Sequence, residues 1–407
     1  MADIPRANVT PPGADQKMFA RLFTEGFRVF FLSAGLFGLF AGAIWTLRLA
    51  GVGNGPELAQ SPVGWHAHEM IFGYATAAIG GFFLTAVPNW TGTPGARRGF
   101  LMLSAGLWLS GRLAIWYSGV LPPVLVAVLD LAFLPVLAAK ILSQLVKRPK
   151  PQNVMFLLFL SYLWAANLLV HLEWTGATLS TAETGLRAGL ITICALISIL
   201  GGRVTPAFTR NAMKRAGVSE ERWPQNTKPV DRMALGLAVL VPLLVLVGVP
   251  GVIAGPVALL FGFVQFARLS RWGGRWCLNQ PILWSLHLSL AMLGLGLVLW
   301  GLAGIGIGGE VAGLHVLGIG AVGGMTLAVM SRAALGHSGR PLIAPRPMAL
   351  GYAMIAMAAL MRWVGGALPA LYQPATVASG LFWCGSFMLF LFAIWPALTG
   401  PRVGAAT

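Results

Sequence analysis

Twelve long apolar runs constrain this chain more than any other feature of its sequence. An α-helix needs about 20 apolar residues to cross a bilayer, and each run approaches that length. We therefore predict an all-α polytopic membrane protein, a bundle of about twelve transmembrane helices. The expected spans lie at approximately 27–48, 66–88, 99–118, 121–146, 153–172, 184–203, 232–249, 251–268, 280–303, 310–331, 347–366 and 374–397.

The charged residues agree with a membrane protein rather than a soluble one. They make up only 10% of the chain, whereas soluble proteins carry roughly 25%. A net charge of +16 would suggest nucleic acid binding in a soluble protein. Here the basic residues fall in short loops between apolar runs, which is typical of membrane topology. We expect membrane lipid as a partner, and no nucleic acid.

The distribution of lysine and arginine predicts the orientation. With the N-terminus inside, 24 of the 28 basic residues lie on the cytosolic side, where such residues concentrate. Both termini are then cytosolic, and inspection shows no internal repeat. The predicted organisation is a cytosolic tail at 1–26, a single transmembrane domain at 27–397 with a basic cytosolic loop at about 204–231, and a cytosolic tail at 398–407.

Ionisable residues concentrate where the second run begins. Ser61 and Pro62 read as a helix start, and His66, His68 and Glu69 follow within two turns. Such groups are costly at the edge of a membrane unless they bind or react with something. Residues two apart diverge by about 200° around a regular helix. The two histidines therefore serve two different centres, or the first turn is irregular.

The remaining histidines extend this pattern. His171 closes the fifth run and His315 opens the tenth, both at the predicted outer side. His287 lies in the ninth run, nearer its inner end, and His337 follows the tenth run on the cytosolic side. Imidazole is a common ligand of copper, iron and zinc. The candidate metal ligands are His66, His68, His171, His287 and His315.

Two arginines and one aspartate in the apolar runs are further candidates. Arg112 and Arg362 lie towards the outer side, where they would either pair with haem propionates or extend to the headgroups. Asp130, in the middle of the fourth run, would belong to a proton path or pair with an arginine. The three cysteines are far apart and form no CxxC, which argues against iron–sulfur and zinc–thiolate sites.

Seven stretches, in order, resemble the NnrS family of bacterial membrane proteins linked to nitric oxide. They are Trp65 to Met70, Thr85 to Gly92, Asn167 to Leu172, Gly201 to Asn211, Leu283 to Leu288, Leu314 to His315, and Met325 to Pro341. The resemblance implies bound haem, expected to be b-type, and copper. It also implies a multi-pass protein of the bacterial inner membrane that acts in nitric oxide handling, nitrosative stress or denitrification. It does not settle whether the protein is an enzyme.

Two alternatives stay open on the sequence. As cofactor-binding residues we expect His68, with His287 or His315 opposite it, for haem, supported by Arg112 and Arg362. We expect His66, with His171 or His315, for copper; alternatively both histidines of the second run chelate one copper in an unwound turn that Gly64 permits. In place of a redox protein, the chain would be a secondary transporter of a metal, haem or small anion, with the histidines as transient ligands.

Overall fold

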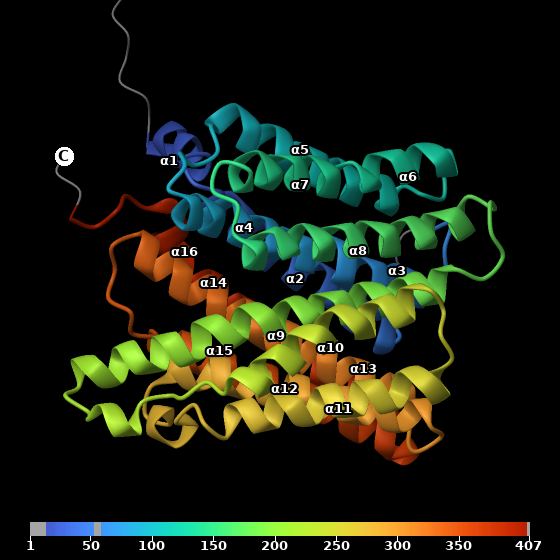
Figure 1. The fold of residues 1–407 in the computed structure, drawn as a ribbon. Coiled ribbons are helices and arrows are strands. Elements are labelled where there is room, and N and C mark those ends of the chain that lie inside the picture. Colours follow the sequence, from blue (N-terminus) through green and yellow to red (C-terminus); the bar gives the residue numbers. More distant parts are fainter. Residues whose placement is uncertain (1–13, 53–57, 405–407) are drawn as a thin grey trace, which may run out of the picture.

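The computed structural model describes residues 14–52 and 58–404, so parts of both predicted tails lie outside the described residues. The described residues are 81% helix and contain no strand. Among them, twelve helices are long and apolar enough to cross a membrane, which confirms the predicted fold class (Figure 1). The elements are α1 (Ala14–Leu22), α2 (Gly26–Leu49), α3 (Pro62–His68), η1 (Glu69–Ala75), α4 (Thr76–Thr91), α5 (Arg98–Trp116), α6 (Pro123–Leu131), α7 (Phe133–Leu145), α8 (Pro151–Trp174), α9 (Ala182–Arg215), η2 (Glu220–Arg222), α10 (Lys228–Leu246), α11 (Gly251–Leu269), η3 (Gly274–Cys277), α12 (Pro281–Gly304), α13 (Glu310–His315), η4 (Val316–Gly323), α14 (Gly324–His337), α15 (Arg346–Ala367), η5 (Pro369–Leu371) and α16 (Tyr372–Thr399).

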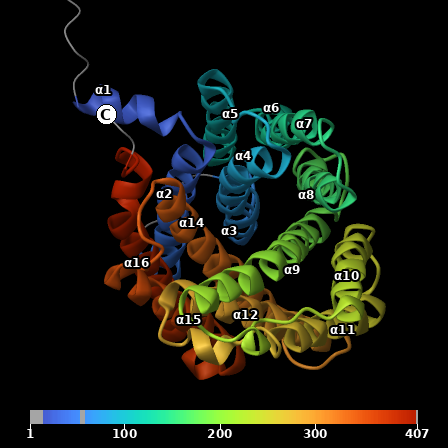
Figure 2. The ribbon, with the colours of Figure 1, turned by 60° about the vertical axis from the view of Figure 1, so that its left-hand side comes forward.

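The twelve spans form three groups of four with the same packing pattern. In each group the second span is central: α3–η1–α4, α9, and α13–η4–α14 have 72%, 83% and 67% of their apolar windows buried, against at most 61% elsewhere. These three helices contact one another. The first span of each group packs against the last span of the group before it, as α2 on α16, α8 on α7 and α12 on α11. The three groups thus have the same order of neighbours at their boundaries, around central helices that contact one another (Figure 2).

Two central spans carry a wide, π-helical segment directly after a histidine. In the first group, Ser61 accepts a hydrogen bond from the Gly64 amide at 3.1 Å and starts α3, which ends at His68. Segment η1 follows at once. In the third group α13 ends at His315 and η4 follows. π-Helical turns are rare and occur frequently at functional sites. Both histidines are therefore candidate functional residues.

Two spans, the sixth and the fourth, differ from the predicted continuous ranges 184–203 and 121–146 near a proline. Pro206 lies inside α9, which continues to Arg215 rather than ending near residue 203, so the basic loop is shorter than predicted. Proline is tolerated in membrane helices where neighbours satisfy the freed backbone. The fourth span is divided between α6 and α7, and the ring of Pro135 leaves the Leu131 carbonyl without its helical donor. The Trp164 indole donates to that carbonyl at 3.2 Å.

Candidate metal centre and its surroundings

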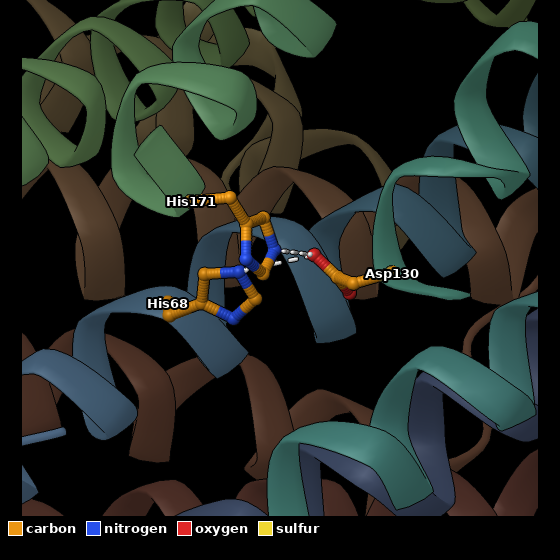
Figure 3. A group of neighbouring side chains, drawn as sticks. All are labelled: His68, Asp130 and His171. Atoms are coloured by element: carbon orange, nitrogen blue, oxygen red, sulfur yellow. Dashed lines mark hydrogen bonds and ion pairs between the residues drawn. The ribbon is translucent and has the colours of Figure 1, made fainter. Parts of the chain in front are cut away.

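A buried His–Asp–His group joins three spans at the end of the bundle where α3 begins, called here the histidine end. His68 Nε2 and His171 Nε2 lie 3.2 and 2.8 Å from the same oxygen, Oδ2 of Asp130. The three side chains converge from α3, α8 and α6 (Figure 3). One donor atom from each lies within 4.8 Å of the others. The residues are at most 5% exposed, so water does not screen their interactions.

A second layer of polar groups holds these three side chains in place. His68 Nδ1 lies 2.9 Å from Glu69 Oε1, and Arg112 donates to both Glu69 and Asp130. Asn167 donates to Asp130 Oδ2 at 2.7 Å, while its own oxygen lies 3.0 Å from His68 Nε2. Two carboxylates and one guanidinium leave one net negative charge. A protonated His68 or a bound cation balances it.

The sequence around His68 explains how so many charges fit together. Gly73, in η1, lets Arg112 approach: a Cβ there would lie 2.7 Å from Arg112 Nη1 and 3.2 Å from Glu69 Oε2. Trp174 packs against both imidazoles, with ring centroids 5.0 Å from His68 and 5.5 Å from His171. Gly73 thus leaves room for the charged side chains, and the Trp174 ring helps to keep both imidazoles buried.

The donor set fits a metal ion. Metal-bound imidazoles usually hydrogen-bond through their second nitrogen to a carboxylate, and ligating carboxylates are hydrogen-bonded in turn. His68 has this arrangement with Glu69, and Asp130 has it with Arg112. Two imidazoles and one carboxylate with open positions suit redox-active transition metals. Binding would replace the contacts of His68 and His171 to Asp130 Oδ2 with bonds to the ion.

A second group of polar side chains lies on the other side of α3. His66 stacks on Trp45, with ring centroids 4.3 Å apart and planes 6° from parallel. His66, His315 and Arg362 lie within electrostatic range of one another. Among the described residues, His66 Nδ1 and Arg362 Nη1 are buried without a hydrogen-bond partner. Such groups are costly to leave unpaired, so both atoms have hydrogen-bonding capacity that the described protein atoms do not use.

His315 is prepared for a ligand role by its own helix. Its Nδ1 lies 2.7 Å from the Val311 carbonyl oxygen. A carbonyl only accepts, so Nδ1 carries the proton and Nε2 keeps a free lone pair. A Cβ at Gly318, one turn further, would meet no described atom within 4 Å. The space beside this part of the helix is therefore open.

The model of one protein family, described as NnrS protein, matches residues 21–402. That is nearly the whole sequence. This chain belongs to the NnrS family. No curated protein matches it. The NnrS family is a metal-binding family, in agreement with the buried His–Asp–His group.

In this NnrS-family chain, the histidines predicted as ligands lie in groups that differ in part from the predicted pairs. His66 and His68 do face different environments, as the regular α3 helix requires. His171, however, lies with His68 rather than with His66. His315 lies near His66. His287 joins neither group, because it contacts Thr209 near the opposite end of α9.

The other candidates are also located. Arg112 is engaged by the two carboxylates of the His68 group, whereas Arg362 belongs to the His66 group. Asp130 pairs with an arginine, one of its two predicted roles. His337 stacks on Phe27 at 5.6 Å between ring centroids. Sequence reasoning did not identify Asp130 as a candidate metal ligand, because nothing in the fourth run shows which residues it faces.

Proposed function

We propose that this NnrS-family protein is a haem- and copper-containing membrane protein that binds nitric oxide and limits nitrosative stress. The observation that carries the proposal is the pair of histidine groups on opposite sides of α3. One group offers two imidazoles and a carboxylate in a dry, charged network. The other offers two imidazoles, an unpaired guanidinium nitrogen and open space. The family resemblance supplies the identities of the cofactors.

His66 and His315 suit the haem. They belong to neighbouring central spans, and each leaves a ring nitrogen available for iron. Arg362 lies close to both, and a guanidinium pairs well with the carboxylate of a propionate. Trp45 would keep the His66 ring in a fixed orientation. Haem iron with a displaceable axial ligand binds diatomic gases, which is the chemistry that the cofactor would supply.

His68, Asp130 and His171 suit the copper. Both ring nitrogens of His68 face oxygen atoms of Glu69, Asp130 and Asn167. Copper at Nε2 would replace the contacts with Asp130 and Asn167, while Nδ1 keeps its bond to Glu69. Arg112 donates to Asp130 and offsets its charge.

The test is to purify the protein in detergent and to measure its visible absorption and metal content. We expect a Soret band, copper, and a spectral change on addition of nitric oxide. His66→Ala and His315→Ala should remove the haem absorbance and keep the copper. His68→Ala and His171→Ala should lower bound copper by at least about tenfold, since even outer-layer changes cost that much.

His337→Ala is the matched control, because it removes an imidazole that stacks on Phe27 away from both groups. It should keep haem and copper. A colourless wild-type protein without copper would contradict the proposed function. If the His66 and His68 variants lose haem and copper to the same extent, the division into two centres is wrong, and the result would point to one centre that holds both cofactors. A single-turnover measurement of nitric oxide loss would then show whether bound gas is consumed.

A further inference from the structure

A third cluster of ligand-type side chains lies at the opposite end of the bundle, called here the basic end. Thr209 of α9, Cys277 of η3 and His287 of α12 meet there. Cys277 Sγ lies 3.6 Å from His287 Nε2, and Thr209 Oγ1 lies 3.6 Å from that sulfur and 3.0 Å from that nitrogen. Thr209 and Cys277 are 0% exposed and His287 is 8% exposed. The cluster is therefore closed off from solvent.

The fold brings these residues together through a tight turn before α12. Gly273 has φ of +68°, which L-residues rarely adopt, and it starts the short η3 helix that ends at Cys277. A Cβ at Gly274 would lie 3.3 Å from His287 Nδ1, so the turn passes directly over the imidazole. Met213 lies one turn beyond Thr209 on α9, and its terminal methyl faces Gly273.

This cluster is distinct from both groups at the histidine end. Thr209 lies 27 residues along α9 from Ala182, which is roughly 40 Å at about 1.5 Å per residue. The Ala182 amide in turn donates to the Glu173 carboxylate, two residues from His171. The function proposed above uses none of Thr209, Cys277 and His287.

The spacing and chemistry of the donors match a soft metal ion. Bonds of about 2.3 Å to sulfur and about 2.0 Å to nitrogen, at a tetrahedral angle, place the two ligand atoms about 3.5 Å apart. The observed separation is 3.6 Å. Thiolate and thioether ligands select cuprous copper. A structural zinc site instead takes four nitrogen or sulfur ligands, and this cluster brings two of them into contact.

Charge favours a monovalent ion in particular. A thiolate and a cuprous ion sum to zero, so their burial leaves no uncompensated charge, which would be costly in this setting. A divalent ion would leave one positive charge beside neutral His287.

We propose that Cys277 and His287 bind one cuprous ion at the basic end of the bundle, and that the flexible Met213 side chain, which lies against Gly273 of the same turn, moves in as a third ligand. The ion replaces the thiol proton, which leaves to solvent, and no change of oxidation state is involved. On binding, the Thr209 hydroxyl gives up its contact with His287 Nε2, because that nitrogen then binds the ion. The site is separate from the copper proposed at His68, and it stands or falls independently of it.

Copper K-edge X-ray absorption on purified protein tests the site, because sulfur is absent from the donors of His68, Asp130 and His171. The protein is loaded anaerobically with one equivalent of cuprous ion, in wild type and in His68→Ala. We expect a sulfur shell at about 2.3 Å in both. Cys277→Ser should remove that shell and weaken cuprous binding, measured by competition with bathocuproine disulfonate, at least about 100-fold.

Cys194→Ser is the matched control, since Cys194 is a buried cysteine in the middle of α9. It should bind copper as the wild type does. Met213→Leu keeps the size of the side chain and should weaken binding about tenfold. Copper bound by wild type and by His68→Ala without a sulfur shell would overturn the proposal, whether or not the Cys277 variant folds. A wild-type protein whose copper is all bound in the sulfur-containing site would support this proposal and count against the copper centre at His68.

Discussion

Replacing Arg112 by leucine should destabilise the protein more than replacing Asp130 by asparagine. Arg112 is the guanidinium between two buried carboxylates, Glu69 and Asp130, and all three side chains are at most 5% exposed. Arg112→Leu leaves both carboxylates facing each other with only His68 to offset them. Breaking a buried pair in this way costs about 3–5 kcal/mol. Asp130→Asn keeps the Glu69–Arg112 pair and should cost about 1–3 kcal/mol, the value of lost charged hydrogen bonds.

The double variant separates charge from shape. Arg112→Leu with Asp130→Asn removes one charge of each sign, so its loss should be smaller than the sum of the single losses by about 2 kcal/mol. For a chain of this length, unfolding entropy converts 1 kcal/mol into a shift of about 1 °C. Thermal unfolding in one detergent, followed by tryptophan fluorescence, should therefore place Arg112→Leu about 4 °C below wild type. Additive losses, or a milder effect for Arg112→Leu than for Asp130→Asn, would refute the charge argument.

Two further predictions test packing and topology. Gly185→Ala should cost about 1–3 kcal/mol of stability through overpacking and so lower the unfolding temperature, because the new Cβ would lie 2.4 Å from the Ala166 carbonyl oxygen. Gly106→Ala is the control: its Cβ would meet no described atom within 4 Å, so the unfolding temperature should not fall. In sealed cells an impermeant thiol reagent should label a cysteine placed at Gly176 but not one at Glu220, since the loop of Glu220 is predicted to be cytosolic. Labelling of the cysteine at position Glu220 would contradict the predicted orientation.

The sequence alone determined the class of protein and the number of spans, because length and hydropathy are local properties. The twelve runs correspond to twelve helices in order. The divergence of His66 and His68 also followed from helical geometry alone, since α3 is regular between them. The Pro206 region was misjudged because the signal for a helix end is also local, whereas the neighbours that tolerate proline are not.

Tertiary structure decided which histidines meet and what balances their charge. His68 contacts Asn167, 99 positions away, and His171 contacts Asp130, 41 positions away. No periodicity along the chain reports such pairs, because they depend on how the three groups of spans pack around their central helices. The order of neighbours shared by the three groups was hidden for the same reason: it resides in helix contacts rather than in residue identity. Hydropathy sets how many helices form, and packing sets which buried charges share one site.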